Sequence, residues 1–190
     1  MGMEFTAVPS EFEEYLDESK TPEKLAEELG LGKALAVAEE YPDAIVIGSD
    51  QMVAIGDSQL AKPKDMDDAR AMIRLATQAP SKIVTSLAIV CKAEGIQTVT
   101  SETMYVYFKS FDEAVVNAYL QTGDYADKAG GYGIQSGAAP LIDHIEGNLD
   151  AVIGLPTHTL APILQKLGVE AHPAEITPPA GLVVKQLQTL

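Results

Sequence analysis

The stretch DAIVIGSDQMVAI, residues 43–55, decides the fold class of this chain. Two short apolar runs, 45–47 and 52–55, are separated by Gly-Ser-Asp-Gln. That pattern predicts a buried strand, an acid where the strand ends, and then more strand. Helical patterns lie on both sides of this stretch, and further strands and helices alternate along the chain. The sequence therefore predicts an α/β protein with a mixed sheet.

The preceding helix is predicted over residues 21–42. Thr21 is suited to the N-cap and Pro22 to the first helical position. Gly30 and Gly32 weaken the middle of the segment, so two helical pieces are expected. The following helix is predicted within 62–77.

The rest of the chain continues the alternation. Strands are predicted at 82–92 and 103–109, and helices at 110–123 and 156–168. Ser110 and Glu113 are expected to form a capping box for the first of these helices, and Asp65 to cap the helix within 62–77. The acidic first 20 residues are expected to form a loop. The proline-rich tail, 172–190, is expected to lie on the surface or to contact a partner.

The composition of the chain limits the kinds of partner that it can be expected to bind. The chain has 190 residues, a formal charge of −15 and one cysteine, Cys91, in an apolar run. The negative charge argues against a nucleic-acid polymer as partner, although local lysines and a cation could still hold a small phosphorylated substrate. No apolar run is long enough for a membrane span, and no signal peptide is evident, so no membrane partner is expected. A buried lone cysteine fits a reducing cytoplasm.

Asp50 and Lys62 form the first candidate constellation. An acid at the break of an apolar strand can bind a divalent cation or activate water. Lys62, held before Pro63, can offer a positive charge to phosphate oxygens. A turn aspartate and a surface lysine would explain the same residues.

The second candidate is the stretch DKAGGYGIQ, residues 127–135. Asp127, Lys128 and Gln135 supply an acid, a base and an amide, and the glycines would let the backbone approach a ligand closely. Taken alone, the stretch is equally compatible with a glycine-rich turn.

Other motifs are incomplete. GLGK at 30–33 lacks the rest of a phosphate-binding loop, no G-x-S-x-G occurs, and the three histidines show no metal-ligand spacing. These patterns therefore favour neither a P-loop enzyme, a serine hydrolase nor a histidine-based metal site.

Several segments together resemble the Maf family of nucleoside triphosphate pyrophosphatases. They occur in the family's order over roughly residues 5–168. The segment D-K-A-G-x-Y-x-I-Q is the most specific, and GLP at 154–156 is the second.

This resemblance implies an elongated mixed sheet flanked by helices, with two lobes around a central cleft. It implies hydrolysis of a nucleoside triphosphate to the monophosphate and pyrophosphate with Mg²⁺ or Mn²⁺. The form of the motif is similar to that of the branch acting on dTTP, UTP and modified pyrimidine nucleotides. A homodimer is the expected assembly, and a role in septum formation or in removing noncanonical nucleotides is implied.

The resemblance also assigns site residues. Asp50 matches the acid that binds metal or activates water, and Glu14, with its neighbour Glu13, falls on a second family acid. By the same resemblance, the residues that would hold the substrate are Lys33, Lys62, Asp127, Lys128 and Gln135.

The sequence departs from the family pattern in several places. No S-x-S-P-R-R loop is found, Gln51 replaces a threonine, and Ala61 replaces the glycine of G-K-P. We therefore expect residues 1–170 to form one N-terminally incomplete Maf-like domain, followed by a tail at 171–190. Either the natural start lies further upstream, or the chain is a diverged homologue. A catalytically inactive homologue that binds nucleotide or protein is the alternative function.

Overall fold

The structure is a computed structural model that describes residues 1–17, 19–56 and 58–187. The chain divides into two compact units, each assembled from three separate segments. Unit 1 consists of Met1–Gln51, Val84–Glu102 and Asp150–Ile176, and unit 2 of Met52–Ile83, Thr103–Leu149 and Thr177–Leu190.

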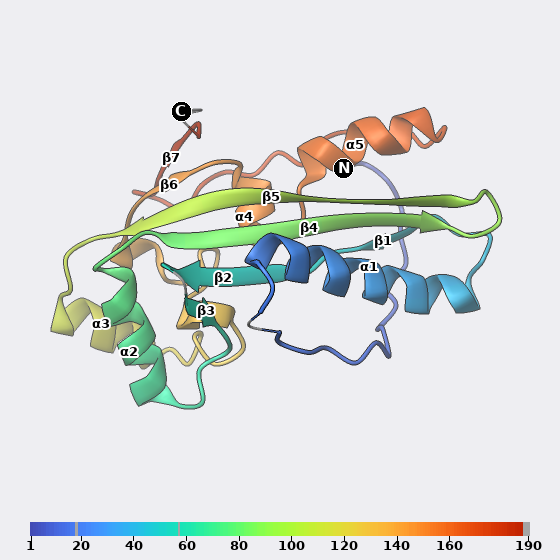
Figure 1. Ribbon diagram of the computed structural model, residues 1–190. Coiled ribbons are helices and arrows are strands. Elements are labelled where there is room, and N and C mark those ends of the chain that lie inside the picture. Colours follow the sequence, from blue (N-terminus) through green and yellow to red (C-terminus); the bar gives the residue numbers. More distant parts are fainter. Residues whose placement is uncertain (18, 57, 188–190) are drawn as a thin grey trace. The chain divides into compact units, whose positions relative to one another are not determined.

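The described strands form one mixed sheet, in the order β3-β2-β4-β5-β6-β7, with β1 paired to β4 (Figure 1). Their bounds are Val46–Gly48 (β1), Gln51–Ile55 (β2), Ser58–Leu60 (β3), Ser81–Cys91 (β4), Ile96–Phe108 (β5), Ile142–Glu146 (β6) and Val183–Lys185 (β7). The β1–β4 and β5–β6 pairs are antiparallel, whereas β6 and β7 are parallel. The predicted α/β class with a mixed sheet flanked by helices is confirmed.

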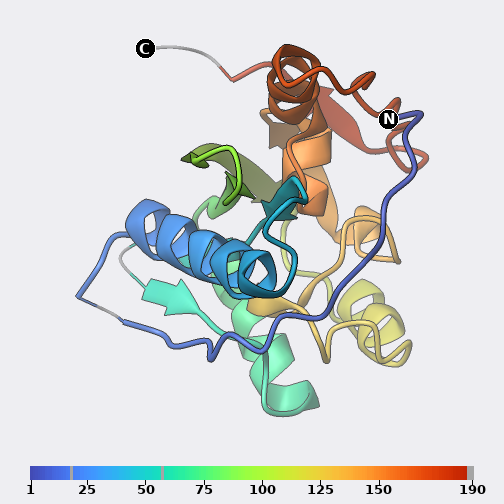
Figure 2. The ribbon, with the colours of Figure 1, turned by 90° about the vertical axis from the view of Figure 1, so that its right-hand side faces the viewer.

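Unit 1 places a helix on each face of strand β4. Ala88 and Val90 of the strand pack with residues of α1 (Pro22–Glu40), and the alternate residues Leu87 and Ile89 pack with α5 (Thr157–Lys166). Figure 2 shows α1 and α5 on opposite sides of the strands. Because side chains alternate along a strand, an unbroken apolar run such as that of β4 is what burial on both faces requires.

Helix α1 is continuous from Pro22 to Glu40, so the expected division into two pieces is wrong. Thr21 caps it as predicted, accepting a hydrogen bond from the amide of Lys24. The glycines serve close packing: a Cβ on Gly30 would lie 2.3 Å from Ser86 Oγ, and one on Gly32 would lie 2.4 Å from Phe12 Cζ. Tertiary contacts compensate for the low helix propensity of glycine.

Unit 2 contains α2 (Met66–Ala76) and α3 (Glu113–Leu120), which contact each other. Asp65 caps α2 as predicted. Asp112, and not Ser110, caps α3, accepting hydrogen bonds from two amides of its first turn. The expected capping box is therefore wrong, because the helix begins two residues later than the box requires.

The terminal segments differ in structure. In the described part of residues 1–20 there is neither helix nor strand, as expected. The tail adds a short edge strand, β7, which is parallel to β6 and was not predicted from the sequence. None of the helices formed by the described residues has the length and apolar character of a membrane span.

Candidate active site

Three of the predicted residues come together in unit 1. The ammonium of Lys33, in the middle of α1, lies 2.5 Å from Asp50 Oδ1 and 3.0 Å from Glu14 Oε1. The Asp50 side chain is only 10% exposed, whereas that of Glu14 is 62% exposed. One lysine thus joins an inner carboxylate to an outer one.

Two hydrogen bonds to Ser86 fix the main chain of Asp50. The Asp50 amide donates to Ser86 Oγ at 2.9 Å, and the Ser86 amide donates to the Asp50 carbonyl oxygen at 2.9 Å. Ser86 is completely buried, and Gly30 leaves the space that its hydroxyl occupies. The acid therefore stands on a rigid strand end, which is what a precisely oriented carboxylate needs.

The neighbours of Asp50 form hydrogen bonds with the C-terminal end of helix α4 (Leu149–Ile153) and with Gly154, which follows it. The Ser49 hydroxyl donates to the Gly154 carbonyl oxygen at 2.8 Å. The side-chain Nε2 of Gln51 donates to the Val152 carbonyl oxygen at 3.0 Å and to Thr85 Oγ1 at 2.8 Å. Gln51, a departure from the family pattern, thus has a clear packing role in this chain.

The two carboxylates that contact Lys33 stabilise its positive charge. Burial opposes the charged form, but hydrogen bonds to Asp50 and Glu14 outweigh it and raise the pKa of the Lys33 ammonium. Lys33 is therefore a fixed positive charge between two carboxylates at neutral pH.

Two more predicted residues meet in unit 2. Lys128 Nζ lies 2.8 Å from Asp127 Oδ1 and 3.1 Å from Asp124 Oδ1. Its hydrogen bond to Asp127 raises the pKa of Lys128, and the same bond lowers the pKa of Asp127. Asp124 was not predicted as a site residue, because the segment from Asp124 to Lys128 is a turn and the i,i+4 pairing rule applies to helices.

The glycines of DKAGGYGIQ shape a tight turn, Ala129–Gly131, against neighbouring segments of unit 2. Gly130 has a φ of +76°, and its amide donates to the Ala61 carbonyl oxygen at 3.1 Å. This bond anchors the turn next to Lys62, whose positive charge contributes to the lowered pKa of Asp127. This stretch can therefore be both a glycine-rich turn and part of a site, because the turn brings the charged residues together.

The remaining predicted residues are exposed. Glu13 and Gln135 both lie on the surface of their own units, and Lys62 is exposed as well. Their roles stay predictions.

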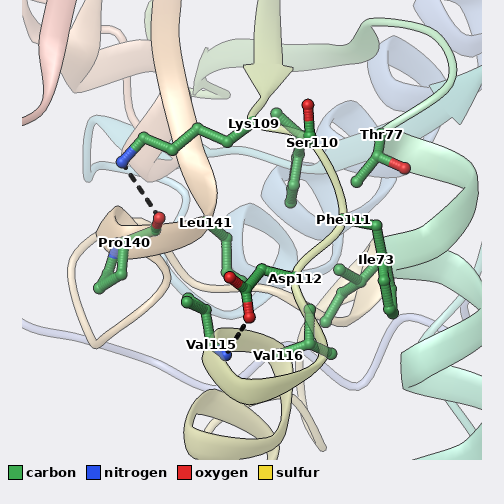
Figure 3. A pocket seen from close by; sticks show the side chains of 11 residues that line it. Ile73, Thr77, Lys109, Ser110, Phe111, Asp112, Val115, Val116, Pro140 and Leu141 are labelled. Atoms are coloured by element: carbon green, nitrogen blue, oxygen red, sulfur yellow. Dashed lines mark hydrogen bonds between the residues drawn. The ribbon is translucent and has the colours of Figure 1, made fainter.

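A pocket of about 300 Å³ lies elsewhere in unit 2 (Figure 3). Most of its lining is apolar, including Ile73, Phe111 and Val116, and Lys109 at its margin donates to the Pro140 carbonyl oxygen. None of the predicted site residues lines it.

Carboxylate oxygens are the donors that Mg²⁺ prefers, and this ion commonly uses one or two carboxylates together with substrate phosphates. Asp50 and Glu14 converge on one point, now occupied by the Lys33 ammonium, and so provide a donor set of that kind. Within the described residues, no group of three or more His, Cys, Asp or Glu side chains is arranged to hold a metal by itself. Water molecules and phosphate oxygens would therefore supply the rest of the coordination of a cation bound here.

A family profile described as "Maf-like protein" matches residues 1–167. The chain belongs to the Maf family. The predicted resemblance is confirmed over most of the chain.

Curated Maf relatives match at a similar level. A protein of Desulforamulus reducens named "dTTP/UTP pyrophosphatase" is 36% identical over 170 residues, covering 90% of this chain and 89% of the relative. A protein of Deinococcus radiodurans with the same name is 37% identical over 171 residues, covering 90% and 86%. A third, from a Geobacillus species, is 36% identical over 167 residues, covering 88% and 89%.

Proposed function

We propose that this chain hydrolyses dTTP, UTP or modified pyrimidine nucleoside triphosphates to the monophosphate and pyrophosphate. The observation that carries the proposal is the Lys33–Asp50–Glu14 cluster in a member of the Maf family. Relatives that align over nearly their whole length are named dTTP/UTP pyrophosphatases. In this reaction a water oxygen bonds to the α-phosphorus, and the bond from that phosphorus to the bridging oxygen of the β-phosphate breaks.

The unit 1 cluster provides the groups that this reaction needs. The Asp50 carboxylate would accept a hydrogen bond from the attacking water and orient it, because its own position is fixed by Ser86. Lys33 would exchange its outer partner, the exposed Glu14, for a phosphate oxygen. Glu13 and Glu14 would then assist in holding a cation.

Mg²⁺ or Mn²⁺ is the proposed cofactor. Asp50 and Glu14 would hold it together with the phosphates, and it would neutralise negative charge on the phosphate oxygens. The reaction requires such neutralisation because charge is spread over the oxygens of the transferring group.

The charged residues of unit 2 would bind the nucleotide. Lys62 and Lys128 would contact phosphate oxygens, and Asp127 would bind the substrate through a water molecule. Gln135, which is exposed and offers both a donor and an acceptor, would position the substrate.

The wider assignments follow from the same proposal. A cytoplasmic location and a homodimer are proposed, with no nucleic-acid polymer and no membrane as partner. Residues 1–170 are proposed as the Maf-like domain and 171–190 as its tail. Removal of noncanonical nucleotides, or a role in septum formation, would be the cellular function.

The test measures pyrophosphate release from dTTP, UTP, CTP, ATP and GTP, each with Mg²⁺, Mn²⁺ or EDTA. We expect turnover of dTTP and UTP that requires a cation and falls at least 100-fold in Asp50→Asn, as expected for loss of a catalytic carboxylate. Asp67→Asn is the matched control, because it makes the same charge change at an exposed position of α2.

No turnover by the wild type at high concentration, with Asp50→Asn indistinguishable from it, would overturn the proposal. Thermal stabilisation by nucleotides without hydrolysis would instead support the inactive, nucleotide-binding alternative.

A further inference from the structure

We propose that Asp124 is a positioning residue for Lys128, and that Asp127 is the exchangeable partner whose place a substrate phosphate takes. This inference rests on the proposed function, in which Lys128 binds phosphate. It assigns a role to Asp124, and it gives different roles to the two acids that contact Lys128.

Asp124 is held on several sides. Its Oδ2 accepts hydrogen bonds from Ser136 Oγ at 2.7 Å and from the Tyr119 hydroxyl at 3.3 Å, while its Oδ1 faces Lys128 Nζ at 3.1 Å. The Asp124 side chain is only 15% exposed. A carboxylate with both oxygens engaged cannot turn away without losing several bonds at once.

Asp127 differs from Asp124 in its exposure and in its contact with Lys128. Its side chain is 80% exposed, and the shared contact with Lys128 is between neighbouring residues on the surface. Exposed ion pairs contribute little because water competes for both partners. A phosphate oxygen can therefore replace Asp127 at Lys128 far more easily than it can replace Asp124.

The alkyl chain of Lys128 is positioned as well as its ammonium. A Cβ on Gly133 would lie 2.4 Å from Lys128 Cε, so the lysine lies directly across the bare backbone of this glycine. The Gly133 amide donates at 3.0 Å to the oxygen of Tyr119, whose hydroxyl reaches Asp124. One chain of contacts thus fixes the surface beneath the lysine and the acid beside it.

Tyr119 acts as a donor throughout the working range of pH. Burial raises the pKa of its hydroxyl well above its usual value, so the proton that it shares with Asp124 is retained. Its buried ring comes from α3, which ties the network to a helix and not only to the loop.

The experiment compares steady-state kinetics of dTTP hydrolysis in Asp124→Asn, Asp124→Glu, Asp127→Asn and Lys128→Met. We expect Asp124→Asn to raise KM about tenfold while changing kcat less than about twofold, because a charge-assisted hydrogen bond that orients a binding group is lost. Asp124→Glu should recover most of this loss. Asp127→Asn should raise KM less than Asp124→Asn does, because the pair that it breaks is exposed.

The decisive measurement is a double-mutant cycle. If Asp124 acts through Lys128, adding Asp124→Asn to Lys128→Met changes KM no further. Equal increases in KM in the two backgrounds, or a larger effect from Asp127→Asn than from Asp124→Asn, would overturn the inference.

A readout without substrate keeps this inference separate from the proposed function. Selective ¹³Cε labelling of lysine should show two inequivalent Hε resonances for Lys128 in the wild type, and one averaged resonance in Asp124→Asn. Unchanged inequivalence in Asp124→Asn would overturn the positioning role even if the wild type hydrolyses dTTP. Averaging in the variant would support it even if the wild type hydrolyses nothing.

Discussion

Lys33 Nζ lies 2.5 Å from Asp50 Oδ1, and this contact joins the middle of helix α1 to the acid between strands β1 and β2. Both side chains are largely shielded from water, at 23% and 10% exposure. Removing either one leaves the opposite charge in poorly solvated surroundings, which costs more than the net value of the pair. The contact is therefore both a stability element and a candidate catalytic element.

Replacing Lys33 tests the stability role. Lys33→Met keeps much of the apolar stem but leaves Asp50 without its ammonium partner, so we expect unfolding to become easier by about 1 to 3 kcal/mol. Urea denaturation at pH 7 would measure this loss. Binding of dTTP should weaken in the same variant, because the proposed phosphate contact is gone.

The matched control is Glu14→Gln. Glu14 is the exposed partner of the same lysine, so its loss should cost less than about 1 kcal/mol. A larger loss from Glu14→Gln than from Lys33→Met would show that the outer carboxylate dominates, contrary to the burial of Asp50.

The two glycines of α1 should respond in opposite directions to alanine. Alanine gains about 1 kcal/mol over glycine in a helix interior. In Gly30→Ala, however, the new Cβ would lie 2.3 Å from Ser86 Oγ and 3.3 Å from the Asp50 amide nitrogen. Overpacking costs about 1 to 3 kcal/mol, so we expect net destabilisation together with reduced activity.

Gly32→Ala is the control for that prediction. The three atoms nearest to its Cβ all belong to the ring of Phe12, which lies in the loop segment before the helix and can shift. We expect a melting temperature equal to or above that of the wild type. Similar losses in both variants would mean that the helix, and not the Ser86–Asp50 contact, sets the effect.

The strand and helix pattern could be predicted from the sequence because it rests on local signals. The apolar runs around Gly-Ser-Asp, the cap at Asp65 and the alternation of elements all involve residues close in the chain. The division of α1 was wrongly predicted because its glycines serve contacts with Ser86 and Phe12, which are distant in sequence. Propensity alone cannot reveal such contacts.

In the candidate site, too, some residues could be predicted from the sequence and others could not. Asp50 was predicted from its position at the break of an apolar strand, and Glu14 and Lys33 from the family resemblance; the structure brings the three together. Asp124 and the hydroxyl of Tyr119 were missed, because their roles depend on how the DKAGGYGIQ turn folds back onto α3. A side chain that positions another residue carries no motif of its own.

The buried hydroxyl of Tyr132 should contribute to the stability of unit 2. It donates at 2.8 Å to the oxygen of Ser81, which is completely buried, and its ring packs edge-on against Phe108 at 4.9 Å between centroids. Tyr132→Phe keeps the ring but leaves Ser81 without this donor, so we expect a loss of about 1 to 2 kcal/mol in urea denaturation. In Ser81→Ala/Tyr132→Phe the loss should be smaller than the sum of the two single losses, and strict additivity would contradict the predicted bond.

The buried acid Asp150 should make stability depend on pH at the acidic end. Burial opposes its charge, but hydrogen bonds from His158 and Thr157 outweigh this and lower the pKa of its carboxyl group. The Nδ1 atom of His158 lies 2.8 Å from Asp150 Oδ2, and its Nε2 lies 2.9 Å from Glu102 Oε1, so the imidazole links two carboxylates.

The sign of the pH dependence follows from the lowered pKa. The stabilisation from Asp150 is complete above the unfolded-state pKa of about 3.9 and is lost as the pH falls through the lower folded-state value. We therefore expect Asp150→Asn to lower the free energy of unfolding by about 2 to 3 kcal/mol at pH 7. The difference from the wild type should shrink steadily below about pH 4.

Urea denaturation of both proteins at pH 7, 5.5, 4 and 3 would measure this, with Asp67→Asn as the control for loss of one exposed charge. The control should stay within about 0.5 kcal/mol of the wild type at every pH. A difference between the wild type and Asp150→Asn that is constant from pH 7 to pH 3 would contradict the assignment, because the Asp150 carboxylate would then stabilise the fold by its shape and not by its charge.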